Sequence, residues 1–399
     1  MNPNPNPIKN RIREAIEAQA ANLKEIAAYI GAHPELGHEE KLASTRLTEE
    51  LEKLGYSVER GTLGLSTAFI AEYRSSKPGP VIALLAEYDA LPEIGHACGH
   101  HLICTMALGA AAGLRAVLDE TGGTLRVYGT PAEETKGAKV DMAAAGLFDR
   151  CDVALMAHPY HIFERSGTSL AMDALQFEFH GKPAHAAANP ELGINALDAV
   201  IQLFNSVNAL RQQTPDHARI HGIISHGGQA PNIIPEYAAA QFYTRSANRA
   251  YTDELSRKVT ACAEAAALAT GCKLTVSNYE YSYDELRTNE TLSAAFTANL
   301  KEAGIPPEAI RTGNDHGSLD LGNVSLRCPA IHPFIQVVDQ PYNLHTVEFR
   351  DAAQTGRAYD AMVFGATMLA YTAADVLTDP DLALRIREEF DRTVPGVRE

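Results

Sequence analysis

The chain has 399 residues, of which 45% are hydrophobic and 21% charged, and its formal net charge is −16. This composition is typical of a globular protein, and the length exceeds what one hydrophobic core usually supports, so two domains are expected. The acidic balance argues against nucleic acid and anionic membrane surfaces as partners, since both require basic patches. The sequence has no run of 18 apolar residues, and its polar first seven residues lack the apolar core of a secretory signal.

Six cysteines, at positions 98, 104, 151, 262, 272 and 328, follow no regular spacing. In a chain of this length such a scatter indicates reduced thiols rather than a disulfide framework. We therefore expect a cytoplasmic protein.

The first part of the chain alternates between helical and strand patterns. In chain order we expect helices over 8–29 and 41–54, strands over 66–74 and 81–87, a helix over 101–120, a strand over 124–129, a helix over 140–148 and a strand over 152–157. This alternation predicts an α/β fold with a mostly parallel sheet covered by helices.

The pattern changes near Gly167. The next expected elements are a strand at 174–180, a helix at 194–212, strands at 218–225 and 237–245, a helix at 252–270 and a strand at 273–281. This βαββαβ order predicts an α+β split-βαβ, ferredoxin-like domain. We therefore expect residues 1–166 to form the first part of the larger domain, 167–283 an inserted domain, and 284–399 the second part, which includes the glycine-rich stretch Gly313–Gly322.

Three consecutive predicted strands are each followed by side chains that bind metals. These are Cys98 and His100 after the first strand, Glu133 and Glu134 after the second, and His158 after the third. Ligands bind beyond the carboxyl ends of strands in an open α/β sheet, so we expect these side chains to lie together. Thiolate, imidazole and carboxylate groups suit a pair of divalent ions such as zinc, manganese or cobalt. A spare glutamate beside them suits a general base.

Each residue also has a simpler structural interpretation. Cys98 alone could be a small buried side chain, and His158 alone a satisfied core histidine. Thr130-Pro131-Ala132-Glu133 also matches a capping box at a helix start. Two adjacent glutamates repel each other unless a cation neutralises them, so the residues taken together favour a metal site.

The remaining histidines are less specific. His185 lies near a predicted loop of the inserted domain, as a surface residue or as a donor to a developing oxyanion. His345 is a candidate distant metal ligand. Four others are interpreted as structural or solvated: His33, His38, His217 and His221.

The motifs resemble the di-metal peptidase and amidohydrolase family of aminoacylase, carboxypeptidase G, hippurate hydrolase and the indole-acetyl-amino-acid hydrolases. The resemblance runs from His33-Pro34-Glu35-Leu36-Gly37 to His345 and is closest for the branch with His-Ala-Cys-Gly-His, here 96–100. The segments 87–92 and 322–325 are similar to the subgroup of aminobenzoyl-glutamate hydrolase and the β-alanyl-dipeptide hydrolase of animals.

The resemblance implies a ligand set for two divalent ions, namely Cys98, His100, Glu134, His158 and His345. It implies that Glu133 is the general base that moves a proton from the bridging water to the leaving amine. Asp89 would orient a ligand from outside the ligand set.

The resemblance also implies that the inserted domain is a lid and dimerisation domain in a homodimer or higher homo-oligomer. His185 would then reach the partner's active site, and Asn232 and Arg245 would help to bind the substrate. Two departures concern the substrate more than the chemistry. His101 replaces the usual Asp or Asn and could add a ligand, and Leu319 replaces a threonine.

The sequence therefore predicts a metal-dependent hydrolase that cleaves the amide bond of N-acyl amino acids or dipeptides. Three alternatives stay open at this point. The same site could act on a non-peptide amide, an ester or an aromatic amine; Cys98 could be the nucleophile of a cysteine hydrolase; or the chain could be a non-catalytic binding protein.

Overall fold

The computed structural model describes residues 6–313 and 317–394 and divides into two units. The larger unit contains the described residues within 1–168, 286–313 and 320–399, and the smaller unit contains 169–285 with 317–319. Both junctions lie two residues beyond the expected boundaries. The assignment of 317–319 to the smaller unit was not expected, and part of the glycine-rich stretch, 314–316, lies outside the described residues.

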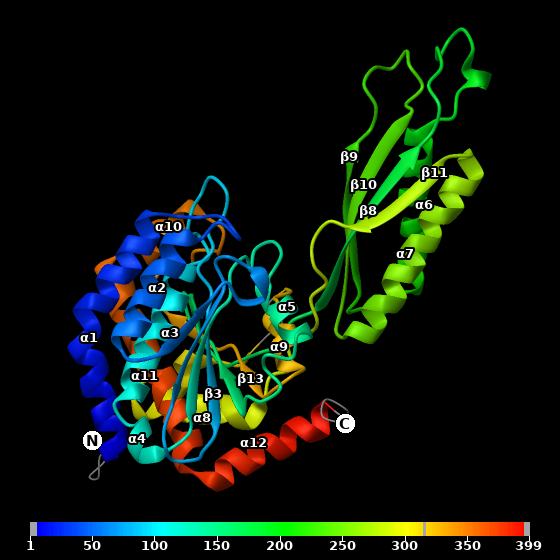
Figure 1. Ribbon diagram of the computed structural model, residues 1–399. Coiled ribbons are helices and arrows are strands. Elements are labelled where there is room, and N and C mark those ends of the chain that lie inside the picture. Colours follow the sequence, from blue (N-terminus) through cyan, green and yellow to red (C-terminus); the bar gives the residue numbers. More distant parts are fainter. Residues whose placement is uncertain (1–5, 314–316, 395–399) are drawn as a thin grey trace. The chain divides into compact units, whose positions relative to one another are not determined.

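A six-stranded sheet runs through the larger unit in the order β1-β2-β4-β3-β5-β13 (Figure 1). Its strands are β1 (Ser57–Arg60), β2 (Phe69–Arg74), β3 (Val81–Ala86), β4 (Thr124–Gly129), β5 (Val153–Leu155) and β13 (Ala330–Ile331). The last four are parallel, whereas β1 and β2 form an antiparallel edge. Because helices cover both faces, β3 is an almost continuous apolar run. The predicted mostly parallel sheet is confirmed.

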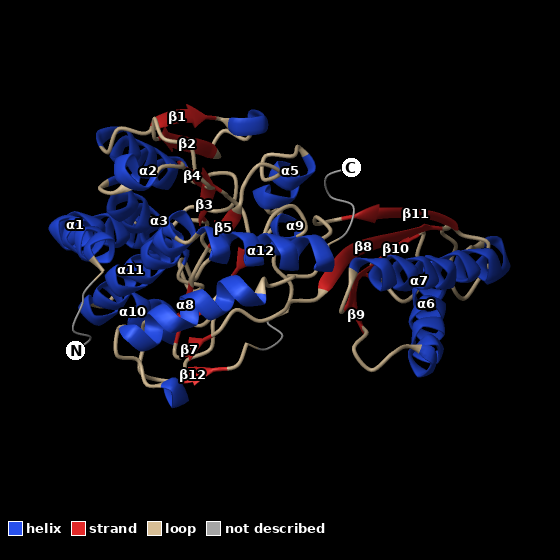
Figure 2. Ribbon diagram, turned by 90° about the horizontal axis from the view of Figure 1, so that it is seen from below, coloured by secondary structure: helices blue, strands red, loops and turns tan. Residues whose placement is uncertain are grey.

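Helices α1 (Pro7–Ala32), α3 (His100–Arg115) and α11 (Gly356–Thr378) lie on one side of this sheet (Figure 2). Helices α5 (Ala138–Ala144) and α9 (Leu321–Ser325) lie on the other side. The remaining helices of this unit are α2 (Lys41–Lys53), α4 (Leu118–Thr121), α8 (Glu290–Glu302), α10 (Val347–Ala353) and α12 (Pro380–Thr393).

Helix α11 is long and apolar enough to cross a membrane by length and composition alone. However, 72% of its most apolar window is buried inside the structure, where α11 packs against α1 and α3. Its apolar character is therefore that of a core helix.

A second, small sheet in the larger unit was not expected from the sequence. It has the order β12-β7-β14-β6 and consists of β6 (His158–Tyr160), β7 (Phe163–Glu164), β12 (Ile310–Arg311) and β14 (Phe334–Gln336). Strand β6 begins at His158 and pairs in parallel with β14. This pairing fixes the backbone of His158 where the chain leaves β5.

The smaller unit is an antiparallel sheet of order β11-β8-β10-β9 with two helices on one face (Figure 1). Its elements are β8 (Ala171–His180), α6 (Ala196–Leu210), β9 (Arg219–His226), β10 (Tyr237–Ser246), α7 (Arg249–Thr270) and β11 (Lys273–Asn278). Phe177, Phe179 and Phe242 lie fully buried in its core. The predicted βαββαβ order is confirmed.

Candidate metal centre

The loops that follow three neighbouring parallel strands meet at one edge of the large sheet. Strands β3 and β4 end in register at Ala86 and Gly129, and β5 lies on the other side of β3. Three groups of potential ligand atoms are found there, and within each group all atoms lie within 4.8 Å of one another. The groups are Cys98, His100 and His158; Cys98, Glu134 and His345; and His100, Glu133 and Glu134. All five predicted ligands and the predicted base are thus brought together.

A close backbone contact positions the two ligands at the start of α3. Gly99 has φ +84, in the left-handed region, and a Cβ atom there would lie 2.6 Å from Cγ of Pro159. Only glycine fits this position without strain. The contact holds Cys98 against His158, with Sγ 3.5 Å from Nε2.

Both buried histidines direct one ring nitrogen into the cluster. His100 Nδ1 lies 3.0 Å from both the backbone oxygen and Oδ1 of Asp89, and its Nε2 has no hydrogen-bond partner among the described residues. His158 Nδ1 lies 2.8 Å from the backbone oxygen of Pro159. Because each Nδ1–H is used as a donor, each Nε2 carries the lone pair, as metal-binding histidines require.

Asp89 connects the two loops, as the sequence predicted for a residue that orients a ligand. One carboxylate oxygen contacts His100, and the other accepts a hydrogen bond of 3.0 Å from the backbone N–H of Glu134. Burial acts to raise the pKa of Asp89, but the charge and hydrogen bond of His100 outweigh it and lower that pKa.

The two adjacent glutamates have opposite electrostatic environments. Burial raises the pKa of Glu133, and the charges of Glu134 and Glu87 add to that effect. For Glu134, burial also acts upward, but the hydrogen bond from His345 and the charge of His100 outweigh it, so its pKa is lowered. Such a separation is typical of one group that exchanges protons beside one that stays ionised.

The electrostatics of the cluster fit divalent cations. Burial acts to lower the pKa of His100, but Cys98, Glu87 and Asp89 outweigh it and raise that pKa. The site thus favours a positive charge beside Nε2, which a cation can supply in place of a proton. By contrast, burial lowers the pKa of His158 to about 4, which leaves it neutral for ligation.

Cys98 has the surroundings of a ligand rather than of an activated nucleophile. Its thiol is buried, and burial and the carboxylate of Glu134 raise its pKa well above the usual value. Activated cysteines have lowered pKa values and partial exposure. The alternative of a cysteine hydrolase is therefore not supported.

His345 reaches the cluster from the segment before α10. Its Nε2 lies 3.2 Å from Oε1 of Glu134, and its backbone N–H donates to the backbone oxygen of Ala97. About half of its side chain, 52%, is exposed, so it forms the outer rim of the site.

A buried ion triad behind the cluster was not predicted. Lys139 is fully buried, and its Nζ lies 2.7 Å from both Oε2 of Glu87 and Oδ1 of Asp320. Oε1 of the same Glu87 lies 3.5 Å from Nε2 of His100. Glu87 was visible as one of two carboxylates after a buried strand, but no sequence signal marked Lys139 as buried.

His101 faces a different environment from its neighbour. Its Nε2 lies 3.2 Å from the backbone oxygen of Ala353, and its ring lies 5.1 Å from that of His96. It belongs to none of the ligand groups among the described residues. The expectation that it could add a ligand is not supported.

The other predicted site residues belong to the smaller unit. His185 and Asn232 are exposed neighbours on adjoining loops, where the N–H of Ala186 donates to the backbone oxygen of Asn232. Arg245 lies on β10, and its Nη1 donates to Ser318 Oγ at 3.0 Å. Leu319 is buried and belongs to the same unit.

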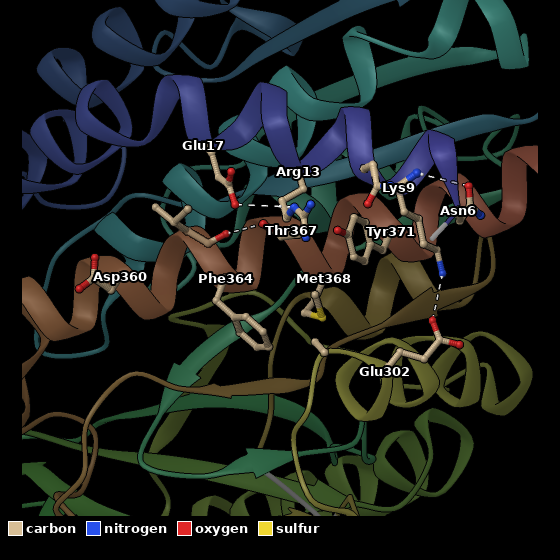
Figure 3. A pocket seen from close by; sticks show the side chains of 13 residues that line it. Asn6, Lys9, Arg13, Glu17, Glu302, Asp360, Phe364, Thr367, Met368 and Tyr371 are labelled. Atoms are coloured by element: carbon tan, nitrogen blue, oxygen red, sulfur yellow. Dashed lines mark hydrogen bonds and ion pairs between the residues drawn. The ribbon is translucent and has the colours of Figure 1, made fainter. Parts of the chain in front are cut away.

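A separate pocket of about 730 Å³ in the larger unit contains none of the clustered residues (Figure 3). Its lining comes from α1, α8 and α11. Its cationic side chains are already paired, with Lys9 Nζ 2.8 Å from Asp375 and Arg13 Nε 3.7 Å from Glu17. We therefore place the candidate chemistry at the ligand cluster.

The fold and the clustered side chains define a hydrolase of the metal-dependent class, and comparisons with known proteins agree. Residues 172–270 match the peptidase dimerisation domain. Xaa-Arg dipeptidase of Mus musculus is 39% identical over 96% of this chain and 92% of its own length. A p-aminobenzoyl-glutamate hydrolase protein of Escherichia coli (strain K12) is 29% identical over 96% of this chain and 94% of its own length.

Among solved structures, a dinuclear metal binding peptidase of the M20 family from Bacillus subtilis superposes with a TM-score of 0.65 at 19% identity, over 90% of this chain and 99% of that one. The chain belongs to the M20 peptidase family. The predicted family and enzyme class, a metal-dependent hydrolase of N-acyl amino acids or dipeptides, are confirmed.

Proposed function

We propose that this enzyme uses two divalent ions to hydrolyse the peptide bond of dipeptides, with Glu133 as general base and acid. The observation that carries the proposal is the convergence of six potential ligand and base side chains at the carboxyl ends of β3, β4 and β5. The free Nε2 atom of His100 and the separated pKa values of Glu133 and Glu134 support it.

The two ions would be held by two groups of residues that share Cys98. These are Cys98, His100 and His158, and Cys98, Glu134 and His345. Zinc, manganese and cobalt all accept thiolate, imidazole and carboxylate ligands. When bound, such a pair of ions lowers the pKa of the attacking water and polarises the scissile carbonyl. Because the Cys98 thiol must stay reduced to act as a ligand, we propose a cytoplasmic location.

Glu133 would handle the proton. Its carboxylate lies in one group with His100 and Glu134 and would accept a proton from the attacking water. It would then deliver that proton to the nitrogen of the leaving amine. A carboxyl group with a raised pKa suits both steps, since general acid–base catalysis works best near the operating pH.

The substrate class that we favour is a dipeptide with a basic C-terminal residue. The Mus musculus relative is named for Xaa-Arg dipeptides, whereas the more distant Escherichia coli relative is named for aminobenzoyl-glutamate. The net charge of −16 favours the first, because an acidic protein attracts a cationic dipeptide and repels a dianion.

Release of free arginine or lysine from dipeptides tests this assignment. We expect chelated protein to be inactive and to regain activity with zinc, manganese or cobalt. Turnover of Xaa-Arg and Xaa-Lys should exceed that of aminobenzoyl-glutamate and fall with rising salt. Activity that survives chelation would exclude the metal mechanism, and preference for aminobenzoyl-glutamate or for an ester would overturn the substrate class.

The smaller unit would contribute substrate contacts. His185 Nδ1 accepts hydrogen bonds from the N–H groups of Ala187 and Ala188 at 3.3 and 3.2 Å. The proton of a neutral ring therefore resides on Nε2, where it can be donated to a developing oxyanion. We propose that His185 acts in this way at the partner's active site, with Asn232 and Arg245 as substrate-binding residues.

A homodimer through the edge of the smaller sheet would supply that partner. Strand β9 has only one neighbour, β10, and most of its residues are exposed. Ile224 of β9 is 45% exposed and Ile201 of α6 is 43% exposed. An apolar open edge of this kind is suited to pairing with a second copy.

The double substitution Ile201→Asp and Ile224→Asp should therefore produce a monomer. Two carboxylates at the apolar edge would have to be buried unpaired in a dimer. Light scattering after size exclusion should give half the wild-type mass, while Leu268→Asp, an exposed leucine of α7 on the same unit, should leave the mass unchanged. An unchanged mass for the double variant would place the interface elsewhere.

A further inference from the structure

The segment 33–40, which joins α1 to α2, packs closely on the loop that carries the two glutamates. A Cβ atom on Gly37 would lie 2.7 Å from Cβ of Ala132, so the two backbones approach as closely as glycine allows. His38 Nε2 lies 3.0 Å from the backbone oxygen of Lys136. The segment thus touches the 130–136 loop at two points on either side of Glu133 and Glu134.

Glu40 makes the third contact, and it is fully buried. One of its carboxylate oxygens accepts a hydrogen bond of 2.8 Å from Thr67 Oγ1. The other accepts one of 2.9 Å from the backbone N–H of Ala132. Glu40 therefore links the 130–136 loop to the residue that precedes Ala68 and β2.

Ala132 needs such support because its backbone conformation is unfavourable. Its φ is +65, in the left-handed region that non-glycine residues rarely adopt. The N–H of Thr135 donates to its backbone oxygen, which closes a turn over Glu133 and Glu134. The direction of both glutamates is therefore set by the conformation of Ala132.

The same segment also supports the loop of Asp89. The backbone N–H of Ala90 donates to the backbone oxygen of Glu35 at 2.9 Å. The Glu35 carboxylate in turn accepts from the N–H groups of Leu42 and Ala43 in the first turn of α2. Residues 33–40 are thereby anchored to α2 and contact both loops that deliver the glutamates and their orienting aspartate.

We propose that Glu40 is a positioning residue for catalysis: its buried carboxylate holds Ala132 in the left-handed conformation that directs Glu133 and Glu134 into the ligand cluster. The inference rests on the proposed role of Glu133. Glu40 itself belongs to none of the ligand groups and acts through the backbone of the 130–136 loop.

The role requires hydrogen-bond acceptance rather than charge. Burial raises the pKa of Glu40 to about 7, and its hydrogen bonds act in the opposite direction. A glutamine can still accept from the Ala132 N–H with its side-chain oxygen. The series that separates positioning from mere structure therefore contains Glu40→Gln, Glu40→Ala and a matched control.

Glu50 provides that control, because it is a buried carboxylate on α2 whose side-chain contacts are Asn22, Arg46 and Lys53. We expect Glu40→Ala to lower kcat by about 10- to 100-fold with KM within threefold. Glu40→Gln and Glu50→Ala should keep kcat within threefold of wild type. Gly37→Ala, which presses on Ala132 from the other side, should also lower kcat.

Hydrogen exchange of the 130–136 backbone supplies a readout that does not depend on activity. Exchange of these amides should accelerate at least about tenfold in Glu40→Ala and stay near wild type in Glu40→Gln and Glu50→Ala. Unchanged exchange and kcat in Glu40→Ala, or equal losses in Glu50→Ala, would overturn the inference. A wild-type protein without peptidase activity would contradict the proposed function instead, and the exchange result would still decide the role of Glu40.

Discussion

Replacing Glu133 with glutamine is expected to lower kcat by about 10³-fold, because the amide cannot accept a proton from the attacking water. Metal content should stay at the wild-type value, since neither of the two groups proposed to hold the ions includes Glu133. KM should change little, because the two side chains have the same shape. The measurement is steady-state turnover of an Xaa-Arg dipeptide together with elemental analysis of the dialysed protein.

Glu134→Gln is the matched control, since it makes the same chemical change one residue along. Glu134 lies in a group with Cys98 and His345, and its loss should reduce metal content as well as kcat. The two variants thus separate proton transfer from metal binding. Retention of more than about a tenth of wild-type kcat in Glu133→Gln would exclude the general-base role. Loss of metal from that variant would make Glu133 a ligand.

The ligand cluster was accessible from the sequence because its members follow consecutive strands of one parallel sheet. Cys98, Glu134 and His158 come together since β3, β4 and β5 are neighbours whose carboxyl ends meet at one edge. No long-range pairing had to be guessed beyond the order of strands. The βαββαβ order of the smaller unit was accessible for a similar reason, since its strands and helices are long enough to show their periodicity.

The small sheet was not accessible, because strands of two or three residues show no period. Strand β7 spans only Phe163–Glu164, and β12 spans only Ile310–Arg311. Their pairing is made by residues almost 150 positions apart. The single predicted strand 152–157 is for the same reason divided in the structure, with β5 ending at Leu155 and β6 beginning at His158.

The residues that support the glutamates were missed because their partners are distant in sequence. Glu40 contacts Ala132 across 92 positions, and Lys139 contacts Asp320 across 181. Neither stands in a local pattern that separates it from an ordinary surface charge. A charged residue inside an apolar environment is recognised only when its counterpart is located, and that requires the tertiary structure.

Replacing Lys139 with methionine should be among the most destabilising single changes in the larger unit. Lys139 is fully buried between the carboxylates of Glu87 and Asp320, at 2.7 Å from each. Burial acts to lower its pKa, but these two carboxylates outweigh it and raise that pKa, so the lysine stays charged. Its removal leaves two buried carboxylates without a cation, a loss of about 3–5 kcal/mol in comparable buried pairs.

The measurement is thermal unfolding of Lys139→Met, in which we expect the apparent Tm to fall on the order of 10 °C. Lys136→Met is the matched control, because Lys136 is an exposed lysine three positions earlier whose loss should be nearly neutral. Neutralising the carboxylates as well, in Lys139→Met with Glu87→Gln and Asp320→Asn, should recover much of the loss, since unpaired buried charge is its cause. A single variant that melts within about 2 °C of wild type would show that the triad contributes little to stability. The Lys139 charge would then matter chiefly to Glu87, whose other carboxylate oxygen lies 3.5 Å from Nε2 of His100.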